Sequence, residues 1–286
     1  MPLIDMHSHW ATRRGYVARS AEELEHQENY FRSKPFYRTE EEMADDLRAA
    51  GVRTILDFGF TKTLPPAEAR EVHEYGMDFE RANRDVVLGH WIHGQPGVSG
   101  SLEEFRRCIE ARVGFVGLAV NGSNGPPASD PSWKPFYDLC IEAGVPALIF
   151  VGTTGLGAGL PGGGGILLDS CHPRHLDEVA ARFPDLTLIA GRPAWPWQSE
   201  TIAILLHKPN IMYELHGWSP RYFTPELVYD LSRRLRDKAM FGADYPLFNY
   251  GRLVEDWKGL GLSDDVLEDI WSNNARRFFQ KLGMDI

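Results

Sequence analysis

The sequence has few cysteines and no long apolar run. Its three cysteines are Cys108, Cys140 and Cys171, and their spacing matches neither a metal-binding nor a redox motif. Such a sparse, odd-numbered set is typical of a reducing compartment and argues against a disulfide framework. No apolar stretch approaches transmembrane length, and the chain opens without the pattern of a signal peptide. We therefore expect a cytoplasmic protein with no membrane partner.

Basic residues are also scarce. The chain has 30 Lys and Arg residues against 40 Asp and Glu residues, which gives a formal net charge of −10 at pH 7. The basic residues are scattered, and the short basic run at 233–238 is typical of the exposed end of a helix. Because a nucleic-acid-binding protein needs a basic patch, we expect no nucleic-acid partner.

Short apolar segments alternate along the whole chain with amphipathic, helix-like segments. This alternation predicts parallel βαβ units, and the continuous apolar segments predict strands buried on both faces. Eight such units in 286 residues predict a (β/α)8 TIM barrel that forms a single domain over residues 1–286. An open doubly wound sheet is the alternative, but it usually has fewer strands and a glycine motif after the first one. The expected strands are residues 3–9, 52–60, 85–93, 114–120, 145–152, 186–192, 210–217 and 239–246.

Two segments are longer than a connection between a strand and a helix requires. They are an aromatic-rich insertion at about residues 10–40 and a glycine-rich loop at about residues 152–166. Both follow the carboxyl ends of strands, where barrel enzymes keep their chemistry, so a lid or a substrate wall is one interpretation. A flexible surface loop is the alternative for the glycine-rich segment, which lacks the ending of a phosphate-binding loop. The insertion is also a candidate contact surface in a homodimer.

The first expected strand ends in two histidines, His7 and His9, with one residue between them. Because side chains alternate along a strand, both imidazoles should point to the same side, with Asp5 one step deeper. The eighth expected strand ends in FGADYP and places Asp244 next to the first strand of a closed barrel. Two imidazoles and one carboxylate suit a divalent transition metal and leave room for water or substrate. We therefore predict His7, His9 and Asp244 as metal ligands, with turn capping as the alternative for Asp244.

These motifs resemble those of the amidohydrolase superfamily. The sequence is most similar to the amidohydrolase-related branch, which includes aminocarboxymuconate semialdehyde decarboxylase, and the similarity extends along most of the chain. It rests on HSH and FGADYP together with HPRHLDEVAARFPDLTLI, WPW, HKPNIMYELHGWSP and DKAMFGADYPL. The resemblance implies a metal-dependent barrel enzyme with a small-molecule substrate. It also implies zinc as the first expectation for the metal, with iron or manganese as alternatives and one or two ions bound.

The sequence departs from that family at two positions. The family normally has a metal-binding histidine at the end of strand five and a catalytic histidine at the end of strand six. Here strand five reads ALIFVGTTG, with Phe150 at the expected position, and strand six reads IAGRPAWPW, with Arg192 there. These two family roles therefore cannot be carried over.

Other polar residues at strand ends are candidates to replace the missing histidines. Glu214 and His216 share a side at the end of strand seven, which is next to strand eight. We predict His216 as a further metal ligand and Glu214 as a catalytic residue. His90 and His93 lie on opposite sides of strand three, so one of them can face the site, and we list His93 as substrate-binding. The alternative for each histidine is a structural, hydrogen-bonded role.

Arg192 and several aromatic residues are the remaining candidates. Arginine is permanently cationic, so Arg192 should hold a carboxylate or stabilise an oxyanion rather than act as a base. A surface salt bridge is the alternative. Aromatic side chains would form an apolar wall for a bulky organic acid or acyl group, although tryptophans are often ordinary core. The candidates for this wall are Phe150, Trp10, Trp91 and Trp195.

Three functions are consistent with this set of residues. The first is a metal-dependent hydrolase in which water attacks an amide, lactone, ester or thioester. Asp244 would accept the proton of the water, Glu214 or His216 would assist, and Arg192 would hold the negative charge of the substrate. The second is a nonoxidative decarboxylase of an aromatic or unsaturated acid, which the resemblance implies and the missing strand-six histidine weakens. The third is an inactive barrel retained for binding, which the intact predicted ligands argue against.

Overall fold

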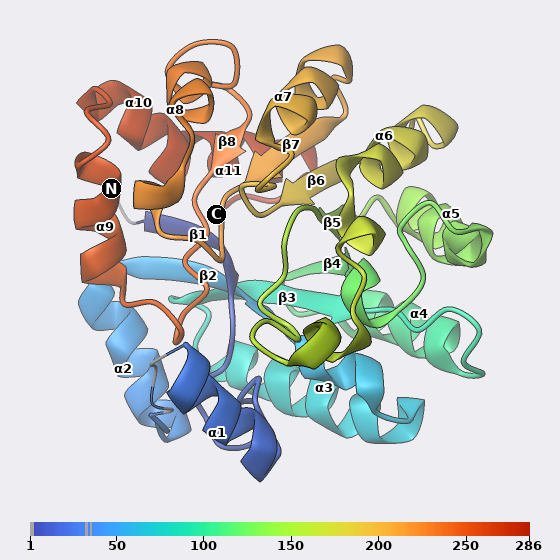
Figure 1. Cartoon of the computed structure of the whole chain (residues 1–286). Helices are drawn as coiled ribbons and strands as arrows, with labels where there is room; N and C mark the ends of the chain where they lie inside the picture. The colour runs from blue at the N-terminus through green and yellow to red at the C-terminus, as the bar shows by residue number, and fades with distance from the viewer. Residues whose placement is uncertain (1–2, 32–33, 35) are drawn as a thin grey trace.

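Eight parallel strands form the centre of the molecule in the computed structural model, which describes residues 3–31, 34 and 36–286. Each strand pairs with the next one along the chain, and helices surround them (Figure 1). This is a (β/α)8 barrel, so the predicted fold is confirmed. The strands are β1 (Leu3–Ser8), β2 (Val52–Asp57), β3 (Val87–His93), β4 (Phe115–Val120), β5 (Ala147–Phe150), β6 (Leu188–Gly191), β7 (Ile211–Glu214) and β8 (Ala239–Met240).

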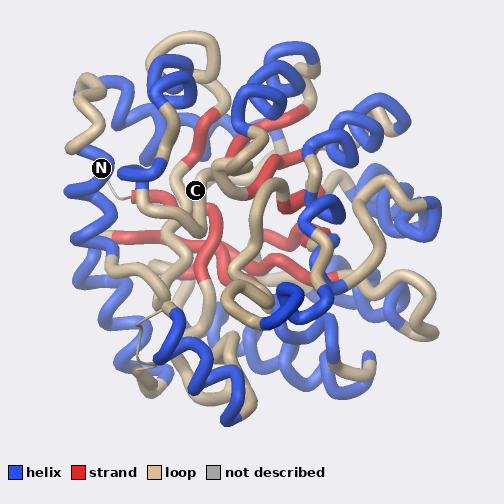
Figure 2. Tube along the Cα trace, in the orientation of Figure 1, coloured by secondary structure: helices blue, strands red, loops and turns tan. Residues whose placement is uncertain are grey.

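The helices connect the strands and lie on the outside of the barrel (Figure 2). Local sequence signals fix their ends: Thr39 and Glu42 form a capping box at the start of α2, and Gly51 ends it with a φ of 65°. The helices are α1 (Ala21–Tyr30), α2 (Glu40–Ala50), α3 (Pro66–Ala82), α4 (Ser101–Ala111), α5 (Lys134–Ala143), α6 (Pro173–Arg182), α7 (Gln198–His207), α8 (Pro225–Leu231), α9 (Tyr250–Lys258), α10 (Asp264–Glu268) and α11 (Asn274–Lys281). Short turns include η1 (Gly59–Thr63) and η4 (Pro161–Gly165).

Apolar side chains pack in two layers. One layer lies inside the barrel, where Ile4, Trp91 and Phe115 meet, and Phe278 and Phe279 of α11 pack against it. The other lies between the strands and the surrounding helices. Burial of both faces explains why the strands appear in the sequence as continuous apolar segments.

The barrel closes between β1 and the segment that follows β8. Three backbone hydrogen bonds cross this seam: Met6 N to Phe241 O at 2.9 Å, Asp244 N to His7 O at 2.9 Å, and His9 N to Tyr245 O at 2.6 Å. These bonds hold the predicted ligands of the first and last strands side by side.

The buried carboxylate of Asp5 reinforces the seam. It accepts hydrogen bonds from Ala243 N at 2.9 Å, Thr54 Oγ1 at 2.9 Å and Tyr250 OH at 2.8 Å. Asp5 was expected on the same side as His7, and this prediction was wrong. The pairing of β1 with β2 shifts register between Asp5 and Ser8, which interrupts the alternation of side chains.

The two long connections meet above the strands. The predicted insertion contains α1, and a backbone bridge between Thr12 and Arg38 joins its two ends. Residues 32, 33 and 35 of the insertion lie outside the described residues. The glycine-rich loop contains η4 and touches α1, because a methyl group on Gly159 would lie 2.2 Å from the Tyr30 ring. Glycine is required there by this close approach.

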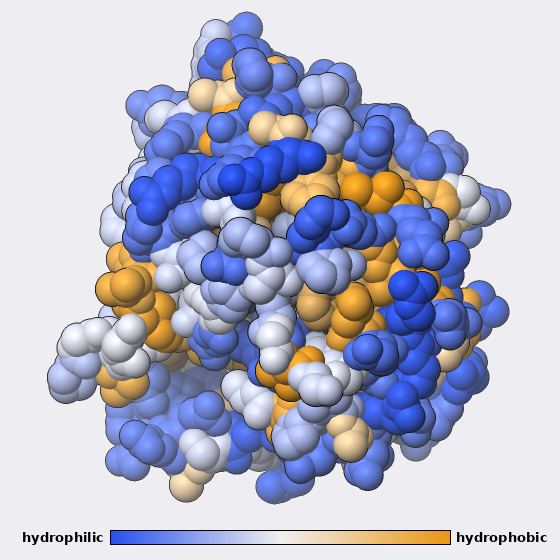
Figure 3. Space-filling model, turned by 90° about the vertical axis from the view of Figure 1, so that its right-hand side faces the viewer, coloured by the Kyte–Doolittle hydropathy of each residue, from blue (hydrophilic) through white to orange (hydrophobic). Residues whose placement is uncertain are grey.

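The surface is mainly polar. The side of the molecule that Figure 3 shows is largely hydrophilic, with hydrophobic residues in smaller patches. Within the described part of the chain, no helix combines the length and the apolar character needed to cross a membrane.

We expect Asp5→Asn to destabilise the fold strongly. Thr54 donates to Oδ2 of Asp5 and Ala243 N donates to Oδ1, so the amide nitrogen would present donors to one of these two groups, and bonds to charged groups contribute about 1.5–3 kcal/mol each. Urea unfolding should show a loss of roughly 3 kcal/mol in the free energy of unfolding. The matched control is Asp138→Asn, which removes an exposed ion pair with Lys134 and should cost less than about 1 kcal/mol. Equal stability of the two variants would contradict this account of the seam.

Candidate metal centre at the barrel mouth

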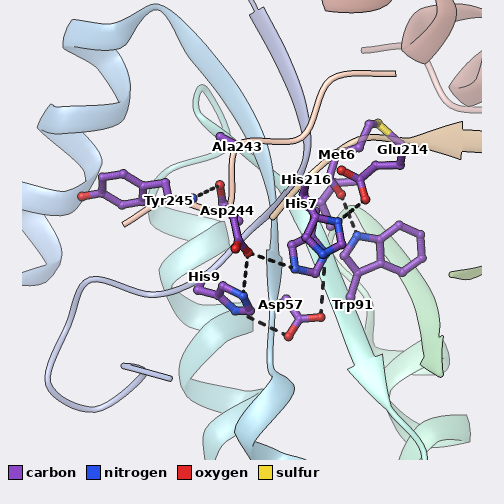
Figure 4. A network of polar contacts seen from close by, with 12 residues as sticks. Met6, His7, His9, Asp57, Trp91, Glu214, His216, Ala243, Asp244 and Tyr245 are labelled. Carbon is purple, nitrogen blue, oxygen red and sulfur yellow. Dashed lines mark hydrogen bonds and ion pairs between the residues drawn. The ribbon is translucent and has the colours of Figure 1, made fainter. Parts of the chain in front are cut away.

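His7, His9 and Asp244 come together at the barrel mouth, the end of the barrel formed by the carboxyl ends of the strands. Nε2 of His9 lies 3.0 Å from Oδ1 of Asp244, and Nε2 of His7 lies 3.8 Å from the same oxygen. Figure 4 shows the three side chains directed toward one another. Ligand atoms that share a metal at bond lengths of about 2.0–2.2 Å lie roughly 3–3.5 Å apart, so the pair of His9 and Asp244 fits one cation as it stands and the pair of His7 and Asp244 needs only a small closure.

The local backbone explains how Asp244 reaches this position. β8 ends at Met240, and Asp244 itself adopts a left-handed conformation with a φ of 61°. Non-glycine residues avoid this region, so the seam hydrogen bonds must hold it there. Gly242 is required because a methyl group at that position would lie 1.6 Å from Oε1 of Glu214.

The protonation of His7 and Asp244 suits a cation. Burial acts to lower the pKa of His9, but the hydrogen bond and charge of Asp244 outweigh burial and raise this pKa, so a metal would displace a proton there. Burial lowers the pKa of His7 well below its usual value, and both of its buried ring nitrogens have no hydrogen-bond partner among the described residues. A neutral imidazole with a free lone pair is the form that binds metals. Burial acts to raise the pKa of Asp244. The hydrogen bond and the charge of His9 lower this pKa by a larger amount, so Asp244 stays ionised. The three residues therefore fit a divalent cation.

Water or a small molecule can reach this group from outside. The side chains of His9 and Asp244 keep 14% and 12% of their surface accessible, whereas the side chain of His7 keeps 1%. Oδ2 of Asp244 lies on the side of Gly217, where a methyl group would be 3.7 Å away. Oδ1 of Asp244 thus faces the two histidines, and Oδ2 faces Gly217.

Asp57 at the end of β2 is a site residue that the sequence analysis missed. Its Oδ1 lies 3.6 Å from Nδ1 of His9, and its Oδ2 lies 4.0 Å from Nδ1 of His7. It therefore faces the two imidazoles from the side opposite to Asp244. Burial acts to raise the pKa of Asp57, but the neighbouring histidines lower it more strongly. In metal sites, a carboxylate that hydrogen-bonds to the histidine ring nitrogen that does not bind the metal fixes the tautomer and the orientation of the ring. Asp57 faces Nδ1, the corresponding nitrogen of His7 and His9.

The two histidines of β3 point in opposite directions, as alternation along the strand requires. Nε2 of His93 lies 2.9 Å from Oδ2 of Asp57, so His93 faces the barrel mouth. His90 is buried outside the barrel, with Nδ1 3.1 Å from Glu80. The structure therefore places His93 in the site and His90 in the core.

Glu214, the last residue of β7, and His216, which follows the strand, form a buried pair. The Glu214 carboxylate contacts Nδ1 of His216, whose ring stacks on His7 with centroids 3.7 Å apart. Burial raises the pKa of Glu214 well above its usual value and lowers the pKa of His216 well below its usual value. His7, Glu214 and His216 also lie close enough together to hold a cation, but Glu214 already binds His216. The geometry gives Glu214 the role of orienting His216.

Phe150 and Arg192, which stand where the family histidines were expected, meet at the same place. The Phe150 ring lies edge-on to His7 with centroids 5.5 Å apart and also approaches His216 at 5.3 Å. The Arg192 guanidinium carbon lies 4.7 Å from the centre of the Phe150 ring. Phe150 thus supplies an apolar wall and Arg192 a cation.

The three tryptophans that were predicted as walls of the site differ in position. Trp10 is fully buried in the outer layer, where it stacks on Phe58 at 5.4 Å, so its predicted contact with substrate was wrong. Trp91 is also fully buried, inside the barrel, and donates its indole N–H to Met6 O at 2.7 Å, so its predicted contact with substrate was wrong as well. Trp195 follows β6 and is 46% exposed. Of the three, Trp195 alone is accessible to a ligand.

A second cluster of potential ligands lies between α3 and α4, outside the barrel. His73, Glu104 and Cys108 approach one another there. Glu104 is already bound by Arg70 and Arg107, and burial raises the pKa of the Cys108 thiol. Two guanidinium groups oppose a cation, and a protonated thiol does not bind one, so this cluster is structural.

Comparison with known proteins relates the chain to a family of enzymes. A family model described as Amidohydrolase matches residues 4–281. The curated 2-keto-4-carboxy-3-hexenedioate hydratase of Sphingobium sp. strain SYK-6 is 27% identical over 213 residues, which make up 65% of this chain and 62% of the hydratase. The chain therefore spans less than two thirds of the length of that relative.

Solved structures share the architecture. An uncharacterized TIM-barrel protein of Bordetella bronchiseptica has a TM-score of 0.74 at 19% identity, with 99% of this chain and 100% of that chain covered. A dihydroxybenzoic acid decarboxylase of Polaromonas sp. JS666, solved with manganese and an inhibitor, has a TM-score of 0.70 at 15% identity, with 99% and 98% covered. At these identities the similarity shows the fold.

We expect His9→Ala to lose the bound metal. The substitution removes one of three ligands and leaves Asp244 with a single histidine partner. Elemental analysis should find roughly one divalent ion per wild-type chain and almost none in the variant. His207→Ala, which changes an exposed histidine at the end of α7, should keep the wild-type metal content. Retention of metal by His9→Ala would rule out this site.

Asp57→Asn should weaken metal binding without abolishing it. The amide keeps the shape of the carboxylate but removes the charge that orients His7 and His9. Loss of such a supporting carboxylate typically lowers metal affinity about 10–100-fold. Competition against a chelator measures this change, and Asp138→Asn serves again as the exposed control. An unchanged affinity would show that Asp57 does not support the metal ligands.

Proposed function

The chain belongs to the amidohydrolase family, and from this premise we propose that it is a metal-dependent hydrolase. In this proposal, water attacks the carbonyl carbon of an amide, lactone, ester or thioester in a small organic acid. The observation that carries the proposal is that a metal-binding group and a guanidinium lie at the same barrel mouth. The metal-binding group consists of His7, His9 and Asp244, and the guanidinium belongs to Arg192.

His7, His9 and Asp244 would hold the metal. A bound divalent cation would polarise a carbonyl and lower the pKa of water at this point. We propose a single ion, because Glu214 and His216 are already paired with each other. The manganese in the decarboxylase of Polaromonas sp. JS666 supports a divalent metal, and zinc and iron stay predictions.

In the proposed reaction, side chains of this protein transfer the proton, bind the substrate and support the metal ligands. Asp244 is ionised and accepts the proton of the attacking water, then passes it to the leaving group. Arg192 holds the carboxylate of the substrate through its planar guanidinium. Phe150 shields one side of the site from bulk water, and the charge of Asp57 faces Nδ1 of both ligand histidines and favours rings that turn Nε2 toward the metal.

Addition of water is favoured over loss of carbon dioxide. The hydratase of Sphingobium, which is 27% identical over its aligned part, adds water by its name, and this supports water as a reactant here. Nonoxidative decarboxylation is the second candidate, because the decarboxylase of Polaromonas shares the fold. The cytoplasmic location, the single domain and the homodimer remain predictions.

A substrate panel in water labelled with oxygen-18 separates these reactions. We expect some activated esters, lactones or thioesters of small organic acids to be turned over, with labelled oxygen in the acid product. A chelator should abolish turnover, and added manganese or zinc should restore it, because the cation supplies the polarisation. Release of carbon dioxide from aromatic or unsaturated acids without label would establish the decarboxylase instead. If the protein purifies without a metal and, with manganese or zinc added, turns over neither the acyl substrates nor the carboxylic acids, it is an inactive binding barrel.

A further inference from the structure

Large apolar side chains are exposed at the end of α1 and along the glycine-rich loop. Surface loops are normally polar, yet residues 143–168 contain no charged residue, and Leu167 is 72% exposed. Exposed apolar surface that is poor in charge marks a site of interaction with another molecule. The side chains of this surface, which we call the α1–loop patch, are Tyr30, Phe31, Leu156, Leu160, Leu167 and Leu168.

The α1–loop patch is held together because α1 packs directly on the loop. A methyl group on Gly155 would lie 3.5 Å from Cζ of Phe31, and Gly159 approaches the Tyr30 ring still more closely. The ring of His26 stacks on Tyr30 with centroids 5.4 Å apart, and Phe31 lies edge-on to Tyr30 at 5.0 Å. These contacts fix the two exposed rings in place, and both rings remain open to solvent.

Glycines in the second half of the loop form a bare backbone surface beside the rings. This half folds back on the first, because a methyl group on Gly157 would lie 2.0 Å from Gly163 O. A methyl group on Gly162, Gly163 or Gly165 would meet no described atom within 4 Å. Bare glycine backbone allows the close approach of a ring, as the contact between α1 and the loop already shows. The patch therefore presents both exposed rings and a surface on which rings can pack.

The area of the α1–loop patch matches the apolar part of a stable interface. A fully exposed side chain of this size presents roughly 150–200 Å², so the exposed fractions of the six residues correspond to roughly 450–600 Å². A stable protein interface buries about 800 Å² on each partner, of which roughly 56–65% is apolar. The apolar area that such an interface needs is thus about 450–520 Å² on each partner, and the patch supplies it.

We propose that the α1–loop patch is the interface of a homodimer, in which the rings of each copy pack on the glycines of the other. In a twofold interface every contact occurs twice, so a surface that carries both rings and bare glycines is complementary to itself. A lipid surface fits less well, because α1 also exposes Glu22 and Glu25, and membrane-binding helices are rich in Lys and Arg. The dimer does not depend on the proposed reaction.

Sedimentation velocity over a range of protein concentrations tests the proposal. Wild-type protein should sediment at twice the chain mass of 32.3 kDa and dissociate on dilution. Leu160→Lys and Leu167→Lys each place a charge in the apolar interface and should raise the dissociation constant of the dimer at least about tenfold. The high exposure of Leu167 means that its substitution leaves the fold of the monomer intact.

Leu206→Lys is the matched control. Leu206 lies on α7 and is 40% exposed, against 41% for Leu160, so the same change is made at the same exposure outside the patch. This variant should dimerise as the wild type does. Thermal unfolding of the diluted proteins should show that all three variants fold.

Three results would overturn the proposal. The first is a wild-type protein that stays monomeric at all concentrations. The second is a dimer whose dissociation constant is unchanged in Leu160→Lys and in Leu167→Lys, which would place the interface elsewhere. The third is a monomer that sediments with vesicles of neutral or anionic phospholipid and loses this binding in Leu167→Lys, which would make the patch a lipid-binding surface.

Discussion

The hydrogen bonds that close the barrel between its first and last strands are the constraint on which the site depends. β8 contains two residues, so the ladder ends before the chain reaches Asp244. The seam is completed by three backbone bonds and by the buried carboxylate of Asp5, which also reaches β2 and α9. Because Asp244 N donates to His7 O, the bond that closes the seam also places the carboxylate beside the two imidazoles.

The site is held under conformational strain that the fold offsets elsewhere. In the part of the chain that the structure describes, three non-glycine residues have a positive φ: Arg192, Ala194 and Asp244. Each such residue costs about 1–3 kcal/mol, and two of them, Arg192 and Asp244, are charged. The backbone bond from Arg192 to Glu214 and the one from Asp244 to His7 fix these two charged residues. Strain is thus concentrated at the positions that the proposed chemistry uses.

Much of the fold and part of the site could be predicted from the sequence. All eight strands lie where apolar segments predicted them, because parallel strands buried on both faces need continuous apolar sequence. The meeting of His7, His9 and Asp244 follows from the order of the strands in a closed barrel. Asp57 was missed although it carries the same signal as Asp244, a carboxylate at the end of a buried strand. A systematic search of all eight strand ends would have found it.

The remaining differences have two kinds of cause: a sequence pattern that was not applied, and structural features that a one-dimensional pattern does not contain. Trp10 follows His9 directly, so alternation already favours the opposite side of the strand, where it is buried in the outer layer. The irregular pairing in β1 that turns Asp5 into the seam has no signal in the sequence.

The central claim is that neighbouring first and last strands jointly hold a divalent cation. The most direct test is anomalous diffraction from a crystal of the protein grown with manganese or zinc. The account predicts a single strong peak within about 2.0–2.3 Å of Nε2 of His7, Nε2 of His9 and a carboxylate oxygen of Asp244. A peak at the helix cluster around His73, or no peak between these three residues at saturating metal, would contradict it.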